Sequence, residues 1–128
     1  MTILIVEDDL SFSMVLEEAL SLWGYRAEWV TAGDTALKRM KDQPFDLVLL
    51  DIYLPDGPGY RLIPDFKRMN PKVHIVAMTG HNSRELEMKV RRQGISYYMI
   101  KPFEIDQLKN MLDYMNEKNE KREVRING

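Results

Sequence analysis

The sequence predicts a doubly wound α/β fold, a three-layer sandwich in which helices cover both faces of a five-stranded parallel sheet. Strand-like segments alternate with segments of helical periodicity about five times along the 128 residues, as expected for consecutive βα units. The central run, Leu47 to Leu50, is unbroken and apolar, which is typical of a strand buried on both faces. The strands are too few and too short for an eight-stranded barrel.

Five segments have the pattern of strands. They are residues 3–6, 25–30, 47–50, 73–78 and 95–100. The first and third are short apolar runs, whereas the second alternates and is rich in aromatic and β-branched residues. The third ends at Asp51 and is followed by the turn-forming residues 54–59, so Asp51 is expected at the carboxyl end of a central strand.

Five further segments have apolar residues at helical spacing. They are residues 12–23, 36–40, 60–69, 83–93 and 105–115. Gly24 and Gly94 are expected to end the first and fourth helices, Asp9 to cap the first, and the turn at 31–34 to cap the second. Pro64 is expected in the first turns of the third helix, where proline is best tolerated. The fourth helix is mostly charged and should pack lightly.

The composition is that of a soluble globular protein, with 45% hydrophobic and 30% charged residues. A formal net charge of -2 gives no global attraction to nucleic acid or anionic membranes. The absence of cysteine excludes disulfide and thiolate chemistry. We expect one domain over residues 1–116, no signal peptide and no membrane span. Residues 117–128 form a charged tail that reads as a fraying helix end or the start of a linker.

Polar side chains follow four of the predicted strands. Glu7 and Asp8 come after the first strand, Asp51 after the third, Thr79 after the fourth and Lys101 after the fifth. We expect them to converge, because the carboxyl ends of parallel strands share one edge, where open α/β sheets bind ligands. Crowded carboxylates repel unless a cation neutralises them, and an open set of oxygen ligands suits Mg²⁺. A nearby lysine and hydroxyl group suit phosphoryl transfer.

This pattern resembles the receiver domain of two-component response regulators over residues 2 to about 115. The resemblance is carried by four fragments: Glu7-Asp8-Asp9, Asp51 with Leu54-Pro55 and Gly59, Thr79-Gly80, and Lys101-Pro102-Phe103. It implies a flavodoxin-like sheet of order 2-1-3-4-5 and a cis Lys101–Pro102 bond. It also implies a bacterial, cytoplasmic phosphoacceptor switch that is not an enzyme beyond its own phosphorylation and slow autodephosphorylation.

Carried over residue by residue, the resemblance assigns a role to each polar group. Asp51 would accept a phosphoryl group from a histidine kinase or a histidine phosphotransfer protein. Asp8 and Asp51 would bind Mg²⁺, for which Mn²⁺ could substitute, together with the backbone carbonyl of Tyr53. Glu7 would act on the metal through water and help to hold Lys101.

The remaining implied roles concern the phosphoryl group and the output. Thr79 and Lys101 would contact the phosphoryl oxygens, and Tyr98 would turn inward on phosphorylation as the switch aromatic. The surface of the fourth helix, fifth strand and fifth helix would then bind an output partner, an effector domain or a second copy. Tyr53 and His81 would flank the path of the attacking water and slow dephosphorylation. Direct binding to nucleic acid or membrane is not expected.

Three other functions are weighed against this one. A phosphatase of the haloacid dehalogenase type needs a second aspartate two residues after Asp51, where this chain has Tyr53. A flavin-binding domain needs a phosphate-binding loop after the first strand, where Glu7 and Asp8 would repel a phosphate. A degenerate receiver that only binds proteins is disfavoured by the intact set of polar groups. Labelling by a small phosphodonor separates these readings.

Overall fold

The computed structural model describes residues 1–127, with side chains described up to residue 118. Its centre is a five-stranded parallel sheet of order β2-β1-β3-β6-β7. These strands are β1 (Thr2–Val6), β2 (Arg26–Val30), β3 (Leu47–Asp51), β6 (His74–Thr79) and β7 (Tyr97–Ile100). Counted along the chain within this sheet, the order is 2-1-3-4-5, so the predicted fold is confirmed. A small antiparallel pair, β4 (Tyr53–Leu54) and β5 (Gly57–Pro58), follows the central strand.

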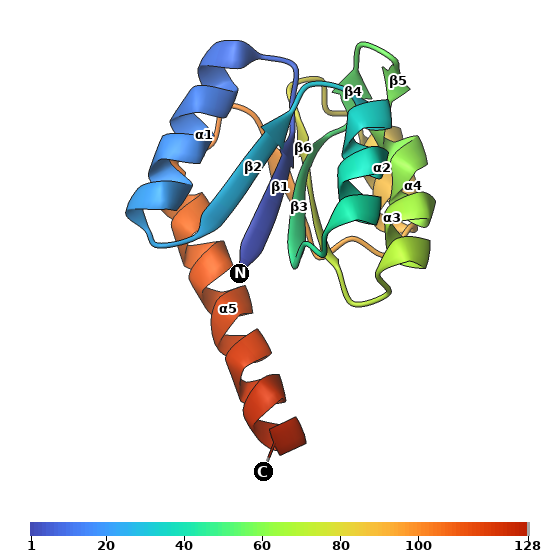
Figure 1. Ribbon diagram of the computed structural model, residues 1–128. Helices are drawn as coiled ribbons and strands as arrows, with labels where there is room; N and C mark the ends of the chain where they lie inside the picture. The colour runs from blue at the N-terminus through green and yellow to red at the C-terminus, as the bar shows by residue number, and fades with distance from the viewer. Residues whose placement is uncertain (128) are drawn as a thin grey trace.

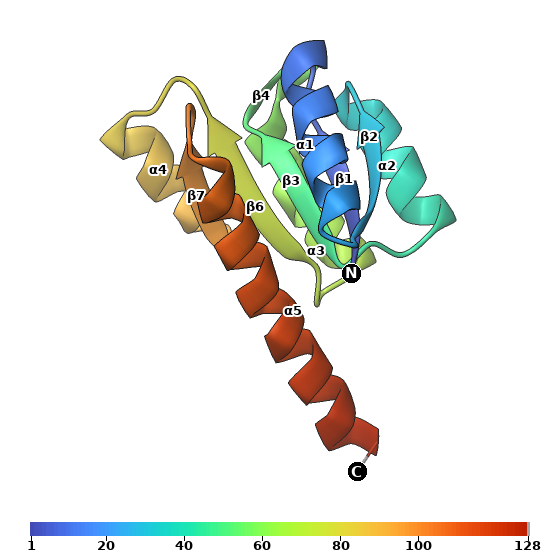
Figure 2. The same cartoon turned by 90° about the vertical axis from the view of Figure 1, so that its left-hand side faces the viewer.

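Helices cover both faces of the sheet, as Figures 1 and 2 show. They are α1 (Leu10–Leu22), α2 (Gly33–Asp42), the 3₁₀ helix η1 (Gly59–Leu62), α3 (Ile63–Met69), α4 (Arg84–Arg91) and α5 (Ile105–Asn127). Helices α1 and α5 lie on one face, and α2, α3 and α4 lie on the other. None of the described helices is long and apolar enough to cross a membrane.

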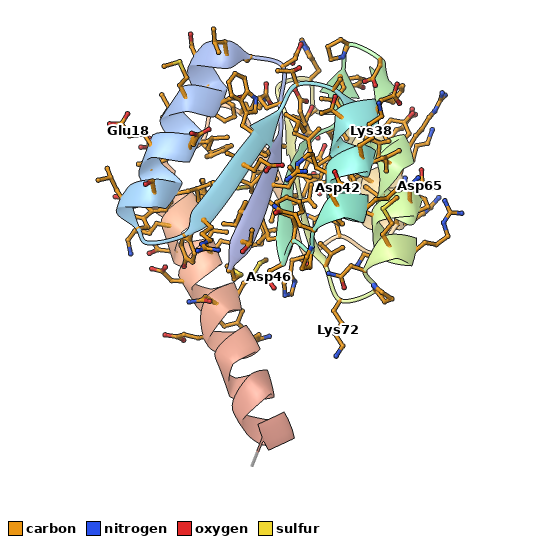
Figure 3. All side chains as sticks on the ribbon, viewed as in Figure 1. Glu18, Lys38, Asp42, Asp46, Asp65 and Lys72 are labelled. Carbon is orange, nitrogen blue, oxygen red and sulfur yellow. The ribbon has the colours of Figure 1, made fainter. Side chains whose placement is uncertain are left out.

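The central position of β3 in the sheet explains why its apolar run is unbroken. Val48 and Leu50 pack in the core layer beneath α2, α3 and α4, whereas Leu47 and Leu49 pack in the layer beneath α1 and α5. Both faces of the strand are therefore buried, and all four side chains are fully enclosed. Charged side chains such as Glu18 and Lys72 point away from the sheet in Figure 3.

Most element ends lie where the sequence predicts. Gly24 and Gly94 follow α1 and α4 with φ values of 87° and 83°, and Pro64 occupies the first turn of α3. Val15 belongs to the apolar series at helical spacing within residues 12–23, yet its side chain is 56% exposed. The buried side of α1 is formed by Ser13, Leu16 and Leu20, and Val15 lies outside that arc.

Helix α5 continues past its amphipathic segment. The apolar spacing ends at Met115, and a helix end was one of the two alternatives for the tail; α5 extends to Asn127 and projects past the amino-terminal edge of the sheet in Figures 1 and 2. The predicted tail at 117–128 is thus helical up to residue 127, and Gly128 lies outside the described residues. The domain boundary at residue 116 stays a prediction.

The cap of α2 comes from a distant loop. The turn at 31–34 is predicted to supply it, but Ala32 at the N-cap position makes no side-chain cap bond. Instead, the N–H groups of Gly33 and Asp34 each donate to the Asp56 carboxylate at 3.1 Å. These two bonds lower the pKa of Asp56 and fasten the β4–β5 loop to α2.

Candidate functional site

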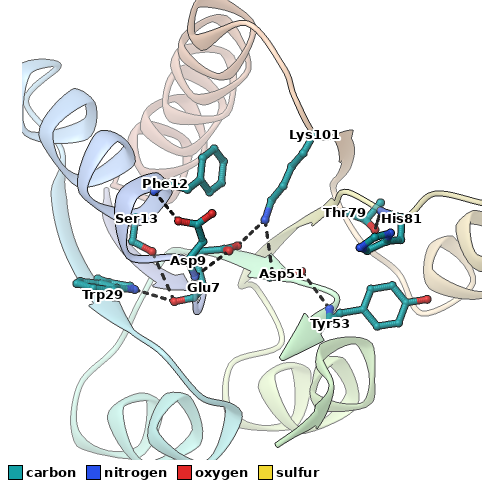
Figure 4. Close-up of polar contacts among 10 residues, drawn as sticks. All are labelled: Glu7, Asp9, Phe12, Ser13, Trp29, Asp51, Tyr53, Thr79, His81 and Lys101. Atoms are coloured by element: carbon teal, nitrogen blue, oxygen red, sulfur yellow. Dashed lines mark hydrogen bonds and ion pairs between the residues drawn. The ribbon is translucent and has the colours of Figure 1, made fainter. Parts of the chain in front are cut away.

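The strand ends bring the predicted polar groups together at one edge of the sheet (Figure 4). Parallel pairing sets β1 beside β3, β3 beside β6, and β6 beside β7, with their carboxyl ends aligned. The carboxylates of Glu7, Asp8 and Asp51 each place an oxygen within 4.8 Å of the others. Lys101 reaches the same cluster, and Thr79 ends the neighbouring strand β6.

Asp51 is held at the centre of this arrangement. Its carboxylate accepts a hydrogen bond from the N–H of Tyr53 at 3.0 Å, and its other oxygen lies 3.5 Å from the Lys101 ammonium. Gly59 packs directly against the main chain here, because a Cβ at this position would lie 2.0 Å from the Asp51 carbonyl oxygen. A side chain at position 59 would therefore displace Asp51.

Glu7 and Lys101 form an ion pair in which the carboxylate is buried and the lysine is half-buried. Glu7 is 1% exposed, and one carboxylate oxygen accepts a bond from Lys101 Nζ at 2.7 Å, while the other accepts the N–H of Asp9 at 3.2 Å. Burial raises the pKa of Glu7 to about 7, and the charge of Asp51 adds to this rise, although Lys101 opposes it. The Lys101 ammonium also lies 4.7 Å from the centre of the Phe12 ring.

In the acidic turn after β1, the neighbouring residues Asp8 and Asp9 have different roles. Asp9 caps α1 by accepting the N–H of Phe12 at 3.1 Å, which confirms its predicted role. Asp8 is exposed, so its carboxylate opens the cluster to solvent. Three carboxylates of this kind, two buried and one exposed, are a suitable set of hard oxygen ligands for a hydrated divalent cation such as Mg²⁺.

Thr79, His81 and Tyr53 line the other side of Asp51. The Thr79 hydroxyl is fully buried and accepts the N–H of His81 at 3.0 Å, which leaves its own hydrogen free to donate. The rings of Tyr53 and His81 meet edge-on, with centres 6.1 Å apart and planes at 76°. Tyr53 remains 45% exposed, so the pair lies at the solvent side of the site.

Tyr98 is already buried. We expected its ring to turn inward only on phosphorylation, but it is 7% exposed here. Its hydroxyl donates to Asn82 Oδ1 at 2.6 Å, and the Arg91 guanidinium lies 5.4 Å from the ring centre. The Lys101–Pro102 peptide bond is cis, as predicted.

Sequence reasoning missed three contributors to the site. Asn82 holds the Tyr98 hydroxyl, Phe12 lies beside Lys101, and Trp29 donates its indole N–H to the Glu7 carbonyl at 2.8 Å. The position of Trp29 near the end of the second strand was a usable signal, because this end is level with Glu7 in a parallel sheet. Nothing in the local pattern singles out Asn82.

Comparisons with known proteins agree with this geometry. A model of the response regulator receiver domain matches residues 3–113. The chain is 33% identical over 111 residues to the transcriptional regulatory protein ZraR of Escherichia coli (strain K12). The matched segment covers 87% of this chain and 25% of ZraR. It therefore spans about a quarter of the length of the curated relatives it matches.

Solved structures share the whole fold. A CheY-like receiver domain protein from Methanospirillum hungatei JF-1 has a TM-score of 0.85 at 27% identity, covering 94% of this chain and 97% of that chain. The beryllofluoride-activated NtrC4 receiver domain dimer has a TM-score of 0.83 at 27% identity, covering 91% of this chain and 97% of that chain. The strand order, the acidic edge and the match over residues 3–113 together show that this chain belongs to the receiver domain family of two-component response regulators.

Proposed function

We propose that this receiver domain acts as a phosphoacceptor switch in which Asp51 takes a phosphoryl group from a phosphohistidine. The donor would be a histidine kinase or a histidine phosphotransfer protein. An Asp51 oxygen would form the new P–O bond as the P–N bond breaks, and the donor imidazole would keep the electron pair. The main support is the position of Asp51, whose carboxylate belongs to the acidic cluster and lies 3.5 Å from the Lys101 ammonium.

The acidic cluster would hold a divalent cation. Asp8 and Asp51 are proposed as direct ligands, with the Tyr53 main-chain carbonyl as a third and Glu7 acting through water. Bound Mg²⁺, or Mn²⁺ in its place, would neutralise the carboxylates and the phosphoryl oxygens. The exposure of Asp8 supports this assignment, because a cation there could keep several waters and still reach an incoming phosphoryl group.

Lys101 and Thr79 are proposed to bind the phosphoryl oxygens. Glu7 holds Lys101 more closely than Asp51 does, at 2.7 Å against 3.5 Å. The ammonium is thus oriented by one carboxylate while its looser contact with Asp51 can pass to a phosphoryl oxygen. Thr79 has a hydroxyl hydrogen available for the same charge. These contacts would stabilise the phosphorylated state, because the charged phosphoryl oxygens reach Lys101 and Thr79 only when the group lies at Asp51.

The output surface is proposed to consist of α4, β7 and α5. Exposed apolar side chains gather on these elements: Met88, Tyr97, Ile100, Ile105 and Tyr114. Such side chains suit a partner protein, an effector domain or a second copy. The similar NtrC4 receiver forms a dimer when activated, which supports the second copy as one candidate.

Gel filtration with light scattering tests the second copy. Beryllofluoride should raise the mass of the wild type, and Ile100→Glu should abolish this shift because it places a charge in the interface. Leu22→Glu is the matched control, because Leu22 is 79% exposed and ends α1, outside the proposed surface. A mass that stays monomeric in every protein would rule out dimerisation under these conditions.

The enzyme alternative finds less support in the site. In a dehalogenase-type phosphatase the residue at position 53 would supply a carboxylic acid, whereas Tyr53 offers its N–H to Asp51 and a phenol at the solvent side. A phenol is a poor proton donor for this purpose at neutral pH. A degenerate receiver is likewise disfavoured, because all four polar residues of the site are present: Asp8, Asp51, Thr79 and Lys101.

Covalent labelling tests the proposed function. Acetyl phosphate with Mg²⁺ should add one phosphoryl group by intact mass, and Asp51→Asn should abolish this addition. The matched control is Asp46→Asn, immediately before the same strand, where the carboxylate accepts the N–H of Thr2. Labelling that persists in the Asp51 variant would exclude Asp51 as the acceptor.

A further inference from the structure

The carbonyl group of Glu7 lies where the ladder between β1 and β2 ends. The N–H of Glu7 donates to the Val30 carbonyl at 3.1 Å, and the chain bends away after Val30. The donors to the Glu7 carbonyl are therefore side chains. Trp29 donates its indole N–H at 2.8 Å, and the Ser13 hydroxyl lies at 3.5 Å. Figure 4 shows both contacts converging on this oxygen.

This carbonyl belongs to the peptide unit that joins Glu7 to Asp8. A peptide unit is planar, so fixing its oxygen also fixes the direction in which the Asp8 main chain leaves β1. The Glu7 side chain is already tied to Lys101 and to the N–H of Asp9. The Trp29 bond adds a restraint on the main chain, at the residue immediately before the exposed carboxylate.

Trp29 is itself well placed to act as a rigid support. It pairs in register with Ile5 in the parallel ladder, and its half-buried ring packs against the core layer beneath α1. An indole has only two side-chain torsions, and here packing restrains the ring while its N–H points to a single oxygen. Ser13, which is fully buried on α1, approaches the same oxygen from the helix.

We propose that Trp29 is a positioning residue for the acidic cluster. Its indole N–H fixes the Glu7–Asp8 peptide unit and thereby aims the Asp8 carboxylate at a divalent cation. The inference rests on the proposed metal-dependent function and deepens it, because it names the strand that orients one of the ligands. Such supporting hydrogen bonds commonly decide how well a metal site binds.

Calorimetric titration of the full chain with Mg²⁺ tests this role. Trp29→Phe keeps an aromatic ring and removes the donor, and it should weaken Mg²⁺ binding about tenfold. Trp23→Phe is the matched control, because Trp23 packs at the edge of the same core layer and makes no bond to Glu7 in the described part of the chain. This control should bind Mg²⁺ as the wild type does.

A second variant separates the hydrogen bond from packing. Replacing Trp29 by β-(3-benzothienyl)alanine in the Trp23→Phe background keeps the ring shape and removes only the N–H. It should again bind Mg²⁺ about tenfold more weakly, with a thermal unfolding midpoint close to that of its background. In Trp23→Phe itself, Trp29 is the only tryptophan. Its fluorescence should change on Mg²⁺ addition and saturate with the dissociation constant that calorimetry gives.

Two results would overturn the inference. One is wild-type Mg²⁺ affinity in a folded Trp29→Phe protein, and the other is unchanged affinity in the benzothienyl variant. Failure of the underlying function looks different, because the wild type itself would then bind no Mg²⁺ and take no label from acetyl phosphate. A lower unfolding midpoint with unchanged Mg²⁺ affinity would assign Trp29 to packing alone.

Discussion

The hydroxyl group of Tyr98 donates to Asn82 Oδ1 at 2.6 Å and so ties strand β7 to the loop that follows Thr79. Asn82 is three residues from Thr79, and Tyr98 is three residues from Lys101. A movement of Thr79 toward a phosphoryl group would therefore pull on this bond. The contact offers a direct route from the acidic edge to the α4–β7–α5 surface.

A double-mutant cycle measures this link. Asn82→Ala and Tyr98→Phe should each lower the free energy of unfolding by about 1 kcal/mol, because each removes one partner of a partly buried hydrogen bond. The double variant should cost little more than either single variant, since both remove the same bond. Urea denaturation gives the three values, and strictly additive losses would mean that the two residues are not coupled.

Loss of this bond should also loosen the neighbouring segment. In Asn82→Ala, amide exchange over residues 84–100 should be faster than in the wild type without any phosphoryl mimic. In the wild type, beryllofluoride should change exchange in the same segment, because α4 buries few side chains and can shift. Exchange that is indifferent to both changes would contradict a switch in this region.

Asp8 should stabilise the protein when a metal is bound and destabilise it when no metal is bound. Asp8→Ala should abolish Mg²⁺-dependent labelling and, in EDTA, raise the free energy of unfolding by roughly 0.5 kcal/mol as one member of a like-charged cluster is removed. Thermal unfolding in EDTA measures the second effect. Asp9→Ala is a control of opposite sign, because it loses the α1 cap and should cost about 1 kcal/mol. A metal-free Asp8 variant that melts below the wild type would contradict the repulsion.

Glu7 should give the metal-free protein a distinct pH dependence. Its pKa rises from 4.5 to about 7 on folding because the carboxyl is buried. Between these two values the native state binds more protons than the unfolded state, so the Glu7 contribution to stability falls as pH rises and is lost above the native pKa. Urea denaturation in EDTA should show this decline in the wild type and a flatter profile in Glu7→Gln. Parallel profiles would contradict the shift.

The rings of Tyr53 and His81 should prolong the life of the phosphoryl group. Water must attack in line with the Asp51 oxygen, and the two rings meet on the solvent side of that position. A Tyr53→Asn, His81→Glu double variant should lose phosphate faster, by up to about a hundredfold, because a polar group could position the water. Loss of label by intact mass gives both rates. A wild type that loses phosphate as fast as the variant would rule out shielding.

Much of this architecture could be predicted because it follows from patterns along the chain. The unbroken run before Asp51 marked the central strand, and polar residues at strand ends marked the edge where they meet. Helix ends at Gly24 and Gly94 followed from the conformational freedom of glycine. In each case the signal and the structure that it specifies lie within a few residues of each other.

The missed features depend on contacts between a side chain and a main-chain group that is distant in the sequence. The Asp56 cap of α2 spans 22 residues, and the Trp29 bond to Glu7 also spans 22. No periodicity specifies which distant side chain satisfies an exposed N–H or carbonyl, because several polar residues could reach it. The length of α5 was left open for another reason, since the charged residues after Met115 lack the apolar spacing by which helices are recognised.

The two segments that flank Asp51 differ in stiffness. The one that follows it in the chain is anchored twice, by the close approach of Gly59 to the Asp51 main chain and by the Asp56 cap on α2. The loop across from it leads into α4, whose buried residues are Leu86 and Val90. A change at Asp51 thus meets a segment held at two points on one side and a lightly packed helix on the other. We therefore expect phosphorylation of Asp51 to displace the α4 side more than the β4–β5 side, which would give the chemical event a single direction of motion.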